Sequence, residues 1–207
     1  MNNVNVIIAV EGPSAAGKTT WCRRHASDFV EEYTPTGTEP DGADRSVQAA
    51  YWSAVNSKRW SRAVALESRL GLAVCDSDPL KLHYSWCLSW IGVEPWIRFR
   101  HELSAVRRAF LAGELGLADF VLVTIPPFEV LREQRLADHT RSRRSIELHA
   151  RLSEPLQIWY EAIEALEPGR VLWHLPEDGM PSQMPPPRSN RSDVALLDAL
   201  VSSLPDR

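Results

Sequence analysis

One segment near the amino terminus has glycines, a lysine and a hydroxyl at a spacing that suits phosphate. The run from Gly12 to Thr19, GPSAAGKT, matches the pattern G-x-x-x-x-G-K-S/T at every fixed position. Glycines let several backbone N–H groups face one anion, and a helix that starts near Lys18 adds the positive end of its dipole. The ammonium of Lys18 can reach the β- and γ-phosphates of a nucleotide, while the Thr19 hydroxyl can bind a magnesium ion between them. We therefore expect ATP and Mg²⁺ as ligands, with the phosphates held by Gly12, Pro13, Ser14, Ala15, Ala16, Gly17, Lys18, Thr19 and Thr20.

Two carboxylates follow a second apolar run. The segment Leu72-Ala-Val-Cys-Asp76 ends in an acid, and Asp78 stands two residues later. Because ligands of parallel sheets bind at the carboxyl ends of the strands, Asp76 is expected beside the glycine-rich turn. A carboxylate there can hold magnesium through water, or it can accept the proton of a hydroxyl that attacks the γ-phosphate. We assign this chemistry to Asp76, and we assign Asp78, which precedes Pro79, to capping of the next helix.

Five arginines gather in a short stretch of an acidic chain: Arg132, Arg135, Arg141, Arg143 and Arg144. Guanidinium groups bind phosphate oxygens in two-point geometry and can neutralise charge on a phosphoryl group during transfer. We predict a mobile lid at about 135–145, in which Arg143 and Arg144 act in catalysis while Arg135 and Arg141 bind the nucleotide. The alternative is a solvated surface whose arginines pair with neighbouring acids.

Apolar runs alternate with amphipathic stretches along the chain. Strands are predicted at 4–10, 29–33, 71–76, 120–125 and 170–175, and helices at 18–29, 43–70, 95–112, 127–136, 145–166 and 193–204, with another helix starting at Pro79. This order predicts an α/β, three-layer P-loop NTPase fold with a parallel sheet of about five strands and helices on both faces. The proline-rich segment at about 176–192 is predicted to be irregular.

Composition limits the class of protein. A chain of 207 residues, 44% hydrophobic and 24% charged, suits a single domain that spans 1–207. The net charge of −4 excludes the broad basic surface of a protein that coats a nucleic acid polymer. With no signal-peptide pattern and no apolar run long enough to cross a bilayer, we expect a cytoplasmic protein without a membrane partner. The three cysteines lack the spacing of a disulfide framework or a zinc site.

Aromatic residues are frequent between the glycine-rich turn and the fourth predicted strand, where this architecture builds its acceptor pocket. The chain has eight tryptophans, more than a domain of this size needs for its core. Aromatic walls suit a flat ring, although core packing is the alternative role for each tryptophan. The residues that we assign to the acceptor are Glu32, Trp52, Asp78, Trp86, Trp90 and Arg98.

The order and spacing of these motifs resemble the thymidylate kinase and deoxynucleoside kinase branch of the P-loop kinases over most of the chain. The segment 11–20 resembles the thymidylate kinase P-loop, and the segment 31–35, EEYTP, falls where this branch has a glutamate and a proline near the acceptor. Residues 76–78 fall at its strand-end acid–arginine motif, 135–144 take the position of the lid, and 145–162 resemble the long helix after the lid.

One position departs from that branch. Those families place an arginine directly after the strand-end acid, whereas this chain has Ser77. The acceptor-side arginine must therefore come from elsewhere or be absent, and Arg98 and Arg100 are candidates to replace it.

These patterns together predict an ATP-dependent kinase that transfers the γ-phosphate to a small-molecule acceptor of nucleoside or nucleotide type. The run Asn56-Ser-Lys58-Arg59 lacks the final acid of a guanine-reading segment, which argues against GTP. An antibiotic or other metabolite phosphotransferase remains an alternative, because the fold does not fix the acceptor. A P-loop ATPase or nucleotide switch without a small-molecule acceptor is the other alternative. The sequence leaves open a monomer or a homodimer.

Overall fold

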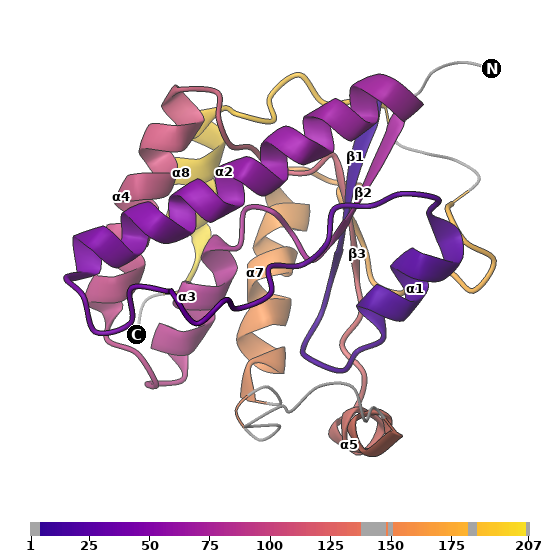
Figure 1. The fold of residues 1–207 in the computed structure, drawn as a ribbon, viewed down its shortest axis with the longest axis horizontal. Coiled ribbons are helices and arrows are strands. Elements are labelled where there is room, and N and C mark those ends of the chain that lie inside the picture. The colour runs from indigo at the N-terminus through magenta and orange to yellow at the C-terminus, as the bar shows by residue number, and fades with distance from the viewer. Residues whose placement is uncertain (1–4, 138–147, 149–150, 182–185, 206–207) are drawn as a thin grey trace.

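A parallel β-sheet with helices on both faces forms the core of the protein (Figure 1). The computed structural model describes residues 5–137, 148, 151–181 and 186–205. Four strands are hydrogen-bonded in the order β2-β1-β3-β4, and all three pairs are parallel. The strands are β1 (Val6–Glu11), β2 (Leu72–Asp76), β3 (Phe120–Val123) and β4 (Val171–Leu172).

The alternation of side chains along β1 explains the two layers of helices. Ile7 and Ala9 point into the larger apolar cluster, whereas Val6, Ile8 and Val10 point into the smaller one. Helix α1 (Lys18–His25) covers the smaller cluster. Figure 1 shows the other layer on the opposite face of the sheet, made by α2 (Arg45–Leu70), α3 (Leu82–Trp90), α4 (Trp96–Leu111), α7 (Ser153–Leu166) and α8 (Val194–Ser203).

The sheet has four strands where the sequence predicts about five. In the predicted strand at 29–33, only Val30 pairs with the sheet, through a parallel bridge to Cys75. The next carbonyl, that of Glu31, accepts a hydrogen bond from Arg59 on α2 at 3.1 Å instead of from a strand. The chain therefore leaves the sheet one residue after the bridge, and this departure carries Glu32 toward the carboxyl ends of the strands.

Several element ends differ from their predicted positions. Helix α1 ends at His25 because Ala26 is already extended, and α3 begins at Leu82 rather than at Pro79. Helix α5 spans Phe128–Ala137, and the last strand keeps only two of its six predicted residues. Of the helix predicted at 145–166, residues 145–147, 149 and 150 lie outside the described residues.

The described residues at 176–192 form neither a helix nor a strand, as their proline content predicts. Within the described ranges, no helix is both long and apolar enough to cross a membrane.

The carboxyl ends of the strands meet at one edge of the sheet. Val10 on β1 is in register with Asp76 on β2, and Glu11 is in register with Val123 on β3. The end of the first strand therefore lies between the ends of its two neighbours, at the place where the glycine-rich turn begins.

The guanidinium of Arg170 is buried without a hydrogen-bond partner among the described residues. Arg170 precedes β4 and is 1% exposed, yet none of its three guanidinium nitrogens has a hydrogen bond to another described residue. Burial, with the positive charge of Arg188 nearby, lowers the pKa of Arg170 to about 10. The charges of Glu167, Asp119 and Asp78 offset burial only in part, and a buried charge without hydrogen bonds destabilises the folded state.

We predict that Arg170→Met raises the stability of the protein, because methionine keeps the apolar stem and removes the unpaired charge. The expected gain is about 1 kcal/mol, or roughly 2–4 °C in melting temperature for a chain of this size. Arg191→Met is the matched control, since Arg191 pairs with Glu67 and Asp119 and its removal should lower the melting temperature. A loss of stability in both variants, measured by thermal unfolding, would show that Arg170 has a stabilising partner.

Candidate active site

The glycine-rich turn folds around the ammonium group of Lys18. This group donates to the carbonyl oxygens of Gly12 at 2.8 Å and Pro13 at 3.1 Å, and the side chain is buried. Gly17 adopts the left-handed conformation, with φ of 81°, and leads directly into α1. The backbone N–H groups of Gly17, Lys18 and Thr19 have no partner in the described part of the chain. These N–H groups, the lysine and the helix dipole form a site for phosphate oxygens.

A hydroxyl and a carboxylate lie side by side below this turn. Thr19 donates a hydrogen bond of 2.6 Å from Oγ1 to Oδ2 of Asp76, and the buried Oδ1 of Asp76 has no partner among the described residues. Burial raises the pKa of Asp76, and the negative charges of Glu32 and Glu11 act in the same direction. A cation would relieve both the missing partner and the crowding of negative charge, so this pair fits the Mg²⁺ of a nucleotide.

Among the described residues, Thr19 and Asp76 are the candidate ligands of a metal ion. No group of three or more His, Cys, Asp or Glu side chains that could hold a metal occurs within the described residues. Magnesium that arrives with a nucleotide needs few protein ligands, because phosphate oxygens and water complete its shell.

Glu11, the last residue of β1, is a buried carboxylate with many donors. Oε1 accepts a hydrogen bond from the backbone N–H of Gly12 at 2.9 Å. Oε2 accepts from the Ser77 hydroxyl and from the backbone N–H of Asp78, each at 3.0 Å. Burial would raise the pKa of Glu11, but the charge of Lys81 and these donors outweigh burial and hold the pKa far below its usual range.

Lys81 lies between two carboxylates. Its Nζ is 3.4 Å from Oε2 of Glu11 and 3.3 Å from Oε1 of Glu32, and it also contacts the Ser77 hydroxyl. Burial opposes the charged form of Lys81, yet the two carboxylates raise its pKa, so the ammonium stays charged. Nε2 of His83 is 3.4 Å from Glu11, but burial lowers the pKa of His83 to about 4 and keeps this ring neutral near pH 7.

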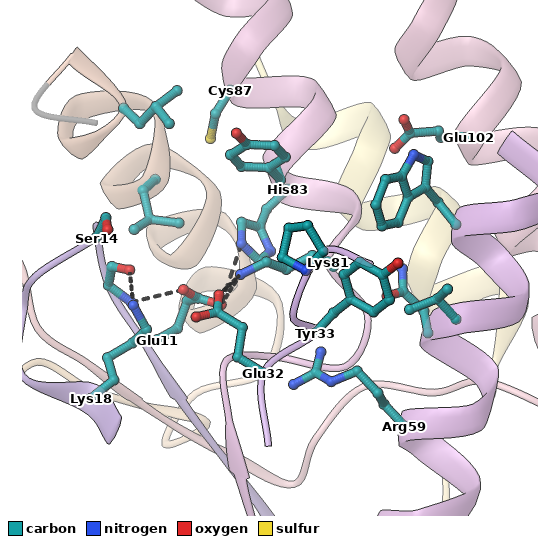
Figure 2. Close-up of a pocket in the computed structure, with 18 of the residues that line it drawn as sticks. Glu11, Ser14, Lys18, Glu32, Tyr33, Arg59, Lys81, His83, Cys87 and Glu102 are labelled. Atoms are coloured by element: carbon teal, nitrogen blue, oxygen red, sulfur yellow. Dashed lines mark hydrogen bonds and ion pairs between the residues drawn. The ribbon is translucent and has the colours of Figure 1, made fainter. Parts of the chain in front are cut away.

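A cavity of about 680 Å³ begins at the glycine-rich turn, which we call the phosphate turn, and extends past Glu11, Glu32 and Lys81. Figure 2 shows Ser14 and Lys18 at one end of the cavity and Glu102 at the other, with Glu32 and Lys81 between them. The far end holds Arg98, which donates to Glu102 at 3.0 Å and to Glu94 at 2.9 Å. The lining therefore has a phosphate-binding end, a charged centre and a second polar end.

Three of the residues assigned to the acceptor from the sequence line this cavity, and three do not. Glu32, Trp52 and Arg98 form part of its wall. Trp86 and Trp90 lie in the larger apolar cluster, where their rings stack with centroids 5.1 Å apart. They are wrong as pocket walls, because both side chains are buried in this cluster, where Trp86 also contacts Trp159 of α7 with ring centroids 6.0 Å apart.

Asp78 is the third residue that was assigned to the acceptor but does not line the cavity, and its carboxylate makes two packing contacts instead. Oδ1 accepts a hydrogen bond from the backbone N–H of Leu80 at 3.0 Å, and Oδ2 accepts from the Tyr160 hydroxyl at 3.1 Å. It therefore caps the turn that precedes α3 instead of the first turn of the helix, which has Lys81 at its N-cap.

The arginine lid cannot be placed. Arg132 is exposed on α5, while Arg141, Arg143, Arg144 and the side chain of Arg135 lie outside the described residues.

The comparisons with known proteins agree with this geometry at the level of the fold. No protein-family model and no curated protein matches the chain. Two solved structures of deoxyadenosine kinase from M. mycoides, one with dCMP and dCDP and one with dATP, are similar to it with TM-scores of 0.53 and 0.51. Each similarity covers 96% of this chain and 98% of the other, at 12% and 11% identity. The chain has the P-loop kinase fold of the deoxynucleoside kinases.

Within this kinase fold, sequence reasoning missed several residues that the structure brings to the site. Arg59 donates to the carbonyl oxygens of Asp76 at 2.7 Å, Ser77 at 2.8 Å and Asp78 at 3.3 Å, and so fixes the turn after β2. Lys81 and Arg59 belong to no motif and come from different helical segments. No pattern in the sequence indicates that these two cations lie at the same site. The presence of Ser77, where the similar families have an arginine, does indicate that another residue must supply the positive charge.

Gly12 provides a test of the phosphate turn. A Cβ on Gly12 would lie 2.2 Å from the backbone oxygen of Thr124, which cannot move without displacing the end of β3. We predict that Gly12→Ala weakens ATP binding at least about tenfold, because the turn must shift away from its phosphate-binding geometry. Isothermal titration calorimetry measures this loss.

Gly113→Ala is the matched control, since Gly113 also has a positive φ but has open space around its Cβ. This control should lose a little stability and keep its affinity for ATP. Equal affinities for ATP in wild type and Gly12→Ala would contradict the role given to the turn.

Proposed function

We propose that the protein is an ATP-dependent kinase that transfers the γ-phosphate to a hydroxyl group of a nucleoside-type small molecule. The observation that carries this proposal is the continuous cavity, which joins the phosphate turn to a polar-ended pocket large enough for such an acceptor. The deoxynucleoside kinase fold supports it, since the similar structures are nucleoside kinases.

The donor half of the site would hold ATP through the turn and Lys18. Thr19 and Asp76 would hold Mg²⁺, which neutralises charge on the β- and γ-phosphates when it is bound.

Glu32 is the better proton acceptor of the two acids considered. Asp76 accepts the Thr19 hydroxyl and does not line the cavity, whereas the carboxylate of Glu32 does line it. Burial would raise the pKa of Glu32, but Lys81 and Lys18 outweigh burial and lower it. The carboxylate is therefore ionised at neutral pH, as a group that takes a proton from an attacking hydroxyl must be. We accordingly move the role of base from Asp76 to Glu32 and keep Asp76 for the metal.

The charges of the cavity favour an acceptor without a phosphate. Arg59 donates to backbone carbonyls, Lys81 lies between two glutamates, and Arg98 is held by two others. Glu11, Glu32 and Glu102 all line the same space. A phosphate group on the acceptor would meet these carboxylates, and Arg59, Lys81 and Arg98 each already have partners while the donor site is empty. A neutral nucleoside avoids this repulsion.

The far end of the cavity suits a nitrogenous ring. Arg98 and Glu102 lie side by side, and together they offer a donor and an acceptor to the edge of a base. Tyr33 and Trp52, which contact each other edge to face with centroids 5.3 Å apart, supply an aromatic wall.

An assay of ADP release with a panel of nucleosides tests this function. We expect ADP release from Mg-ATP to depend on a nucleoside and to be absent in Lys18→Ala. If another alcohol or an aminoglycoside stimulates ADP release and no nucleoside does, the result would favour a metabolite phosphotransferase. Release at the same rate with and without every acceptor would favour an ATPase or switch and would contradict the proposal.

The role of Glu32 predicts a specific kinetic defect. Glu32→Gln should lower kcat by about 100- to 10,000-fold, because an amide cannot take the hydroxyl proton. Its affinity for ATP should change little, since Glu32 is not part of the phosphate turn. Glu31→Gln is the matched control, because the neighbouring side chain is exposed, and it should keep wild-type turnover. Wild-type kcat in Glu32→Gln would remove Glu32 from the mechanism.

A further inference from the structure

Lys81 has a backbone conformation that is costly for its residue type. Its φ of 48° and ψ of 4° lie in the left-handed region, and it serves as the N-cap of α3 without a side-chain capping bond. A non-glycine residue in this region is strained, and such strain persists only where the surrounding structure enforces it. The conformation has no capping role, so its effect is to turn the side chain back toward the end of β1.

The surrounding structure enforces this direction. Ser77, four residues earlier, also has a positive φ, of 73°, and its hydroxyl contacts both Lys81 and Glu11. Arg59 holds the carbonyls of the same turn. Figure 2 shows Lys81 beside Glu11 and Glu32, and its ammonium lies 3.4 Å and 3.3 Å from their carboxylate oxygens.

The two carboxylates that flank Lys81 differ in what else they contact. Glu11 already accepts three other hydrogen bonds, from Gly12, Ser77 and Asp78. Glu32 has Lys81 as its one hydrogen-bond partner in the part of the chain that the structure describes. Both ion-pair distances exceed 3.2 Å, longer than the 2.7–2.9 Å of a strong charge-assisted bond. Lys81 therefore has two long ion pairs and one close contact, with the neutral Ser77 hydroxyl, so a group with more negative charge than either carboxylate can attract its ammonium.

We propose that Lys81 is a switching cation: it pairs with Glu32 while the donor site is empty and moves to the γ-phosphate when ATP binds. This inference rests on the proposed kinase function. Lys81 and Lys18 line the same cavity, so the displacement stays within it. Glu32 thereby loses its partner only when the donor is present, and it becomes a stronger base at that moment.

The chemical step then balances without any further reactant. The acceptor hydroxyl gives its proton to the carboxylate of Glu32, and its oxygen forms a bond to the γ-phosphorus. The bond from this phosphorus to the β–γ bridging oxygen breaks, and ADP leaves. Lys81 keeps its proton throughout and stabilises the charge of the phosphoryl group in transfer, which makes it a catalytic residue.

The charges that face Glu32 come from three other elements besides the turn before α3. Glu32 interacts with Lys81, with Lys18 on α1 and with Glu11 on β1, while its own charge acts on Asp76 of β2. Without Lys81, burial and the negative charge of Glu11 would oppose ionisation of Glu32, and Lys18 would still favour it.

The first test compares ATP and ADP binding and needs no acceptor. Lys81→Met should weaken ATP binding about tenfold or more and leave ADP binding unchanged, because only ATP carries the γ-phosphate. Lys81→Arg should restore part of the preference for ATP, and Lys58→Met, which removes an exposed lysine of α2, should match wild type. Equal weakening of ATP and ADP, or no weakening, in Lys81→Met would overturn the proposal.

The second test uses the pH dependence of turnover. In Lys81→Met, the acid limb of the profile of kcat/KM for ATP, which reports the enzyme before ATP binds, should move up by about 1 pH unit or more, because the cation that holds Glu32 ionised in that state is gone. An unchanged acid limb in a folded Lys81→Met protein would contradict the pairing with Glu32. A wild-type protein without acceptor-dependent turnover would refute the kinase function, whereas the ATP and ADP affinities would still decide whether Lys81 binds the γ-phosphate.

Discussion

The carboxylate of Glu11 connects the parts of the site. It is 2% exposed at the end of the central strand β1, and it accepts hydrogen bonds from the first residue of the phosphate turn and from two residues after β2. A carboxylate so deeply buried is stable only when donors and cations surround it. This requirement draws the turn after β2, the ammonium of Lys81 and the start of α3 to the edge of the sheet where the phosphate turn begins. Loss of this charge would release all three.

The same requirement sets the acid–base character of the cavity. Lys81 is attracted by Glu11 and in turn lowers the pKa of Glu32, so a basic carboxylate stays ionised beside the acceptor space. Asp76 is bonded to Thr19 instead, and burial raises its pKa more than the Thr19 hydrogen bond and the charge of Lys18 lower it. Two acids at one sheet edge thus acquire different environments, one suited to a proton and one to a metal.

Local chemistry explains how much the sequence could predict. The phosphate turn and the alternation of strands and helices depend on neighbouring residues, and the parallel sheet with helices on both faces was confirmed. The strand predicted at 29–33 was wrong beyond Val30 because Arg59, distant in sequence, takes the carbonyl of Glu31. Trp86 and Trp90 were wrong as pocket walls because helical spacing does not tell which face of α3 meets the core. Lys81 and Arg59 act through contacts between separate elements, which no spacing reveals.

The central claim is that an acceptor hydroxyl meets Glu32 in front of ATP, and a structure of the complex tests it most directly. Crystals of the protein with a nucleoside, a non-hydrolysable ATP analogue and Mg²⁺ should show the acceptor hydroxyl within hydrogen-bond distance of the Glu32 carboxylate. Mg²⁺ should be bound by Thr19, and the ammonium of Lys81 should lie against the γ-phosphate. A nucleoside bound outside the cavity, with Glu32 still paired to Lys81 beneath a fully occupied ATP site, would contradict the account.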